Sequence, residues 1–186
     1  MTASLPGFES PAVGFDQPFE MLEACHDRVR RSLALLGKLV AYLSDHPHDA
    51  QSRSAAHDVL RYFELAAPLH HQDEEAHVFP SLSSAADGTD SALKAAVVRL
   101  RADHAQMESL WAELRPVLQV WASDAAGAAP DERARRLAAA FAGLYDEHLV
   151  VEETLVFPAA RARIDEAGQI AMSHDMAHRR KAAAPR

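Results

Sequence analysis

Hydrophobic side chains recur at alternating intervals of three and four residues along most of the chain, which is the period of an amphipathic helix. Four such segments are separated by short stretches that contain proline, glycine or small polar residues. Their bounds are about residues 18–45, 50–79, 90–121 and 130–165. Long amphipathic helices with short connections predict an all-α protein with the architecture of an up-down-up-down four-helix bundle.

The flanks of this bundle differ from it in composition. Residues 1–17 carry two prolines and two glycines and predict an irregular arm, whereas residues 18–165 form the bundle. Residues 166–186 predict a short helix after Gly168 and a tail, with basic side chains that suit a helix C-terminus. Pro68 predicts a kink within the second helix, because an interior proline removes one backbone hydrogen bond.

The inward stripes of the predicted helices are apolar except at a few positions. A histidine is the single polar residue on the stripes of the first and third helices, at His26 and His104. The stripe of the second helix continues through His70, Glu74 and His77. The corresponding inward positions of the fourth helix are His148, Glu152 and Leu155.

Two segments nearly repeat each other: residues 70–80 and 148–158 both fit His-x3-Glu-Glu-x2-Val-Phe-Pro, at a separation of 78 positions. His26 and His104 are also 78 positions apart, and each precedes the first histidine of its repeat by 44 positions. Duplication of a helical hairpin accounts for all three spacings. Because both histidines of a hairpin are about equally far from the turn, helical rise places all four imidazoles at one level.

Two glutamates join this layer, since Glu74 and Glu152 each lie one turn after a histidine on the same helical face. Unpaired buried carboxylates cost more than a small domain can carry, and two of them repel each other. A pair of cations resolves this, with imidazoles donating nitrogen and carboxylates bridging. Ligation by nitrogen and oxygen without thiolate favours iron or manganese, with zinc as a further alternative. The expected metal ligands are His26, His70, Glu74, His104, His148 and Glu152.

Composition restricts the classes of partner and compartment. The formal net charge is −8, so we expect no nucleic-acid partner, because phosphate binding needs a basic face. No apolar stretch approaches the ~20 residues that cross a bilayer, and the N-terminus lacks the pattern of a secretory signal. The single cysteine, Cys25, is expected to be a packed thiol and fits a reducing compartment. We therefore expect a cytoplasmic protein without membrane contact.

The motif order resembles the hemerythrin family, in its bacterial hemerythrin-like branch with the HHE cation-binding motif. The resemblance covers about residues 18–165, and its signature is the order His…His-x3-Glu…His…His-x3-Glu. It implies a non-haem centre of two iron ions (Fe–O–Fe) that binds dioxygen or related small molecules such as nitric oxide or peroxide. By position it implies four terminal ligands and two bridging ones: His26, His70, His104 and His148, and Glu74 and Glu152.

The resemblance therefore implies a protein that binds or senses one of these small molecules. The alternatives are a di-iron enzyme that detoxifies peroxide or nitric oxide, and a module that buffers or responds to iron through a partner the sequence does not identify. Two positions differ from the oxygen-carrying hemerythrins. Glu108 stands where they have a fifth histidine, and Glu153, beside Glu152, stands where they have an aspartate. We expect a more carboxylate-rich centre.

Two Glu-x-x-His pairs, Glu23 with His26 and Glu74 with His77, resemble halves of a ferritin-type site. Ferritin-like proteins carry such pairs on the second and fourth helices and lone glutamates on the others, so the hemerythrin-type assignment is favoured. His71 and Glu75 lie one residue off the inward line and are expected beside the site or at the surface. The remaining histidines are expected in solvent or at a helix end: His46, His48, His57, His174 and His178.

Overall fold

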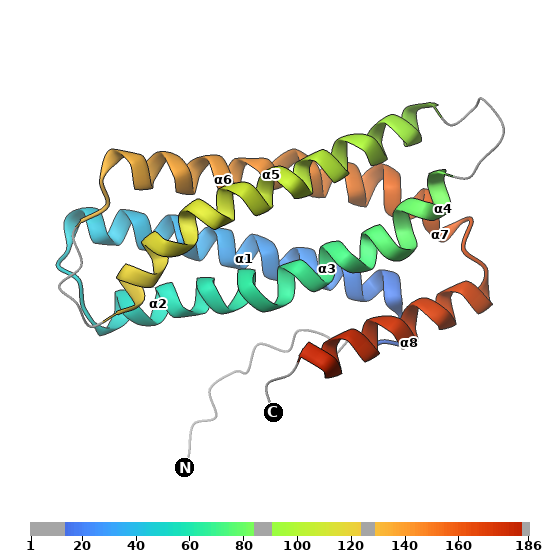
Figure 1. Ribbon diagram of the computed structural model, residues 1–186, viewed down its shortest axis with the longest axis horizontal. Coiled ribbons are helices and arrows are strands. Elements are labelled where there is room, and N and C mark those ends of the chain that lie inside the picture. The colour runs from blue at the N-terminus through green and yellow to red at the C-terminus, as the bar shows by residue number, and fades with distance from the viewer. Residues whose placement is uncertain (1–13, 84–90, 124–128, 184–186) are drawn as a thin grey trace, which may run out of the picture.

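The computed structural model is a bundle of four helical rods with one additional helix. The described residues are 14–83, 91–123 and 129–183, and every regular element within them is helical. The first rod is α1 (Pro18–Asp45) and the third is α5 (Ser91–Ala122), and all four rods run side by side along the long axis (Figure 1). Helix α8 (Glu166–Ala183) packs on the outside of the first and second rods. The predicted all-α four-helix bundle is confirmed.

The second and fourth rods contain π-helical turns, in which one extra residue enters the helix. The second rod consists of α2 (Ala50–Arg61), η1 (Tyr62–Ala66), α3 (Ala67–Asp73), η2 (Glu74–Val78) and α4 (Phe79–Ser83). The fourth consists of α6 (Glu132–Val151), η4 (Glu152–Val156) and α7 (Phe157–Arg161). The turns η2 and η4 begin at the equivalent glutamates of the two repeats, so the duplication extends to this backbone irregularity.

These two π turns shift the inward face by one residue and correct two sequence-based expectations. At the end of η2 the buried positions are Val78 and the next residue, Phe79, so His77 does not continue the inward line and is only half-buried, against α8. At the end of η4, Val156 is buried whereas Leu155 is 39% exposed. The sequence-based expectation assumed a regular period of three and four residues and so did not allow for an inserted residue. For this reason the expected inward positions of His77 and Leu155 were wrong.

Other boundaries and one irregularity also differ from expectation. The second rod continues to Ser83 rather than ending at residue 79, and the fourth ends at Arg161 rather than at residue 165. Asp131 accepts a hydrogen bond from the Ala134 N–H at 2.7 Å and caps the fourth rod, which therefore begins after Asp131 rather than at Pro130. The irregularity expected at Pro68 takes the form of η1 just before it, where the wider turn accommodates the missing N–H. Helix α8 has 18 residues and begins ahead of Gly168, so it is longer than the expected short helix.

The hydrophobic core has two parts, separated by a polar layer. On the four rods, one cluster includes Val29, Ala67, Met107 and Tyr145. The other includes Leu22, Val78, Leu100 and Val156. On every rod the histidine of the polar layer lies between these two clusters, which therefore fix the rods on both sides of it. Cys25 is buried, as expected for a packed thiol. None of the described helices has the length and apolar character needed to cross a membrane.

Helix α8 is held by apolar and ionic contacts together. Met172 and Met176 are fully buried in the second cluster. Arg179 and Arg180 pair with Asp73 of α3 at 3.1 Å and 2.7 Å, and the Asp73 side chain is inaccessible to solvent. The sequence suggested only a helix-terminus role for these arginines, whereas the structure shows that they anchor α8 to the second rod.

Candidate metal centre

The six residues expected to form the site meet in the polar layer between the two hydrophobic clusters. Their exposed fractions lie between 0% and 6%. The ring centroids of His26 and His70 are 4.9 Å apart, and those of His104 and His148 are also 4.9 Å apart. The four histidines therefore converge at one level of the bundle, as two pairs contributed by the two hairpins.

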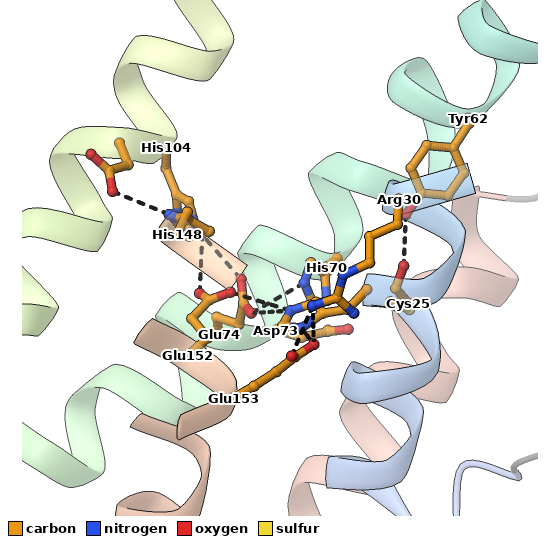
Figure 2. A network of polar contacts seen from close by, with 12 residues as sticks. Cys25, Arg30, Tyr62, His70, Asp73, Glu74, His104, His148, Glu152 and Glu153 are labelled. Carbon is orange, nitrogen blue, oxygen red and sulfur yellow. Dashed lines mark hydrogen bonds and ion pairs between the residues drawn. The ribbon is translucent and has the colours of Figure 1, made fainter. Parts of the chain in front are cut away.

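Each of the two glutamates reaches both histidine pairs (Figure 2). Glu74 Oε1 lies 3.2 Å from His70 Nε2, and its Oε2 lies 3.5 Å from His104 Nε2. Glu152 repeats this arrangement, with 3.2 Å from its Oε2 to His26 Nε2 and 3.2 Å from its Oε1 to the histidine four residues before it. A carboxylate with one oxygen toward each pair is arranged as a bridging ligand would be.

Several buried nitrogen and oxygen atoms of this layer, which could be ligands of a metal ion, have no hydrogen-bond partner among the described residues. They are the Nε2 atoms of His26, His70 and His104 and all four carboxylate oxygens of Glu74 and Glu152. Buried polar atoms normally have partners, and unpaired carboxylates are costly to bury. Cations at this level would supply the missing partners, and a set of imidazole nitrogens and carboxylate oxygens suits iron, manganese or zinc. The residues present therefore fit a dinuclear metal centre.

The donor atoms fall into two groups that share Glu152. Within each group all ligand atoms lie within 4.8 Å of one another. The groups are His26, His70, Glu74 and Glu152, and His104, His148 and Glu152. Two neighbouring groups with a common carboxylate are the arrangement required for two adjacent cations.

The opposed charges of the layer shift its pKa values. Burial lowers the pKa of the His26 imidazole, but its contacts with Glu152 and Glu74 outweigh burial and raise that pKa to about 10. The pKa of His104 is raised to about 8 in the same way, because its contact with Glu74 outweighs burial. Burial lowers the pKa of His70 and raises that of Glu74. Protons and cations therefore compete for the same atoms.

The His26 ring nitrogen that points away from the polar layer, Nδ1, contacts a carboxylate that is itself part of an ion pair. His26 Nδ1 donates to Glu153 Oε1 at 2.8 Å, and Arg30 donates to both oxygens of that carboxylate, each at 2.8 Å (Figure 2). This contact fixes the tautomer, so that Nδ1 carries the hydrogen and Nε2 faces the layer. Glu153 therefore acts through His26 and lies outside both donor groups.

Two further histidines have outer carboxylates of the same kind. His104 Nδ1 donates to Glu75 Oε1 at 2.9 Å, and His148 Nδ1 donates to Asp103 Oδ2 at 3.3 Å. The repeated Glu-Glu step drew attention to Glu75, which does lie beside the site. Asp103 was missed, because it belongs to no repeat and only its position before a candidate ligand marks it.

Two residues that were candidates for the site lie next to it. The His71 ring stacks on that of His104, with centroids 4.0 Å apart and planes inclined by 11°, but it belongs to neither donor group. Glu108 is exposed on α5 and also belongs to neither group.

Other histidines make structural contacts or face solvent. His77 Nε2 lies 2.7 Å from Asp175 of α8, which removes the ferritin-type pair with Glu74. His48, expected in solvent, donates from Nε2 to the Trp121 carbonyl at 2.8 Å and ties the loop before α2 to the end of α5. The exposed ones are His46, His57, His174 and His178.

Two comparisons relate this chain to known proteins. An uncharacterized protein of Haemophilus influenzae is 32% identical over 141 residues, which is 76% of this chain and 77% of that protein. The sequence pattern of the hemerythrin HHE cation-binding domain matches residues 17–160, which include the six residues of the polar layer and all four rods of the bundle. On this match and this fold, the chain belongs to the hemerythrin family.

Proposed function

We propose that the protein holds two iron ions in this layer and binds or senses dioxygen, nitric oxide or peroxide there. The observation that supports the proposal is the set of buried donor atoms without hydrogen-bond partners in the described chain, with each glutamate turned toward both histidine pairs. The net charge of −8 also favours a small neutral ligand over a nucleic acid. The single cysteine supports a cytoplasmic location.

In this proposal the chain's residues have separate tasks. Four histidines and two glutamates would hold the ions: His26, His70, His104 and His148, and Glu74 and Glu152. Iron held here would supply a redox-active Lewis acid with coordination positions for a small ligand. Outer carboxylates such as Glu153 keep the imidazoles in one tautomer. The two hydrophobic clusters keep bulk water away, so that an incoming ligand competes with little solvent.

Anaerobic iron loading followed by separate exposure to dioxygen, nitric oxide and hydrogen peroxide tests the proposal. Visible spectra of the loaded protein are expected to change with at least one of these ligands, at amounts near the iron content. The His148→Ala variant is expected to lose that change, because it removes one of the two imidazoles on its side of the layer. An iron-loaded protein whose spectrum responds to none of the three ligands contradicts the proposed function.

The same experiment separates binding from catalysis. A binding or sensing protein changes its spectrum once and then stops. Sustained consumption of excess peroxide or nitric oxide identifies an enzyme that uses the same centre.

A further inference from the structure

A cleft of about 1190 Å³ opens between the second rod and α5, next to the polar layer. Much of its wall is aromatic, with Phe63, Trp111 and Phe141 among the lining residues. Three arginines and three glutamates also line it, so its charges balance. Sites for small molecules usually have volumes of ~300–1,000 Å³, so solvent and solutes have ample room in this cleft.

Two stacked imidazoles separate the cleft from the donor atoms. His71 and His104 both line the cleft, yet His104 is only 6% exposed and its Nε2 is fully buried. The His71 ring lies nearly parallel to that of His104 at 4.0 Å, and its centroid is 6.3 Å from the centroid of His148. The His71 ring therefore covers the approach from the cleft to the pair formed by His104 and His148.

The two duplicated halves differ at this point. The position equivalent to His71, 78 residues later, is Leu149, which is buried in the hydrophobic core. The position equivalent to Glu108 is Arg30, which binds both oxygens of Glu153 at 2.8 Å. On the side of the cleft, Glu108 has the same charge as Glu75, which corresponds to Glu153, and Glu75 pairs instead with Arg101 at 3.4 Å.

The cleft reaches the polar layer on one side only. His104 lines it, whereas neither His26 nor His70 is among its lining residues. An external ligand that enters through the cleft therefore meets the pair formed by His104 and His148 first.

We infer that the cleft is the access route by which external ligands reach the side of His104 and His148, and that the His71 ring is a steric gate at its inner end. This inference rests on the proposed function, because it presupposes metal ions in the layer. A passage covered by one imidazole admits uncharged molecules no larger than hydrogen peroxide and holds back bulky ones until the ring moves. The balanced charges of the cleft give an ionic ligand no advantage.

Substitution of His71 tests the gate. His71→Ala removes the ring, and His71→Phe keeps a ring of similar size without its nitrogens. Under anaerobic conditions, stopped-flow absorbance gives the rate of nitric oxide binding to the iron-loaded protein and the rate of iron extraction by 2,2′-bipyridine. We expect His71→Ala to accelerate extraction by the bulky chelator about tenfold, which is ~1.4 kcal/mol in activation free energy, and nitric oxide binding much less. His71→Phe should leave both rates close to wild type.

If His71→Phe changes the two rates as much as His71→Ala does, the imidazole nitrogens matter rather than the ring. That result would overturn the gate.

The access route itself is tested by filling the cleft with a larger side chain on its wall. Ala112 lines the cleft on α5, whereas Ala140 is exposed on α6 and does not line it. Ala112→Trp should slow nitric oxide binding several-fold and Ala140→Trp should not. Equal effects of the two tryptophans would overturn the route.

Iron content, measured for every variant, separates this inference from the proposed function. A wild-type protein that takes up no iron contradicts both. Iron-loaded proteins whose rates respond to neither His71→Ala nor Ala112→Trp contradict this inference alone, and the proposed function then stands with a different access route.

Discussion

Replacement of Glu153 by alanine removes the carboxylate that accepts the His26 Nδ1 hydrogen bond at 2.8 Å and that Arg30 holds through both oxygens. Loss of an outer partner of a metal-ligating histidine typically weakens metal binding about 10–100-fold, or ~1.4–2.7 kcal/mol. We expect a loss near the upper end of this range, because Arg30 holds both oxygens of this carboxylate and so fixes its position against His26.

Glu75 provides a matched comparison at the equivalent position of the other repeat. It accepts from His104 Nδ1 at 2.9 Å, but Arg101 lies 3.4 Å away and contacts only one of its oxygens. Because this carboxylate is held less firmly than Glu153, Glu75→Ala should weaken iron binding by about 10-fold, near the lower end of the range. Glu113→Ala serves as the control, because Glu113 is exposed and pairs only with Arg133 in the described chain.

The affinity is measured by anaerobic titration of iron(II) in competition with a coloured chelator. Thermal unfolding of the metal-free variants checks that each one folds. The reasoning is refuted if Glu153→Ala binds iron as tightly as the wild type. It is also refuted if Glu113→Ala weakens binding by the same factor.

Three further predictions follow from the same contacts. His70→Ala should reduce the iron content and remove the rise in melting temperature that iron loading produces, as differential scanning calorimetry can show. Because His26 and His104 have pKa values raised to about 10 and about 8, both are protonated at pH 7 and must lose protons when a cation binds. Apparent metal affinity should therefore rise with pH up to about 10, with release of protons that a pH indicator detects. Arg180→Ala should lower the unfolding free energy in urea by ~1.5 kcal/mol, because it removes one of the two arginines that pair with buried Asp73 while Arg179 stays 3.1 Å away.

The fold was predictable because its determinants are local and repeated. An uninterrupted alternation of three and four residues specifies each rod, and the short connections specify antiparallel neighbours. The start of α1 at Pro18 and its end at Asp45 coincide with the expectation, since a proline suited to the first turn and a polar His-Pro-His segment mark them.

The convergence of the six inward residues was also predictable, because the 78-residue duplication fixed their relative heights. Their outer partners were harder to foresee. Glu153 and Glu75 were visible in the repeated motif, but their contacts with His26 and His104 depend on how the turns η4 and η2 approach the neighbouring rods. The only sequence signal for Asp103 is that it directly precedes the candidate ligand His104.

Features that depend on backbone insertion or tertiary contact could not be predicted from a regular period. The π turns moved His77 and Leu155 off the inward line, and no residue type in these segments specifies an extra residue per turn. The pairing of Arg180 with Asp73 joins segments far apart in the chain, and Arg180 on its own resembles an ordinary basic helix end. Tertiary packing, rather than local pattern, decides such positions.

Anomalous diffraction from crystals of the iron-loaded protein, collected at the iron absorption edge, tests the central claim most directly. The account predicts two anomalous peaks in the polar layer, one beside His26 and His70 and one beside His104 and His148, with Glu74 and Glu152 between them. Absence of iron from this layer, or iron bound only at surface carboxylates, would contradict it.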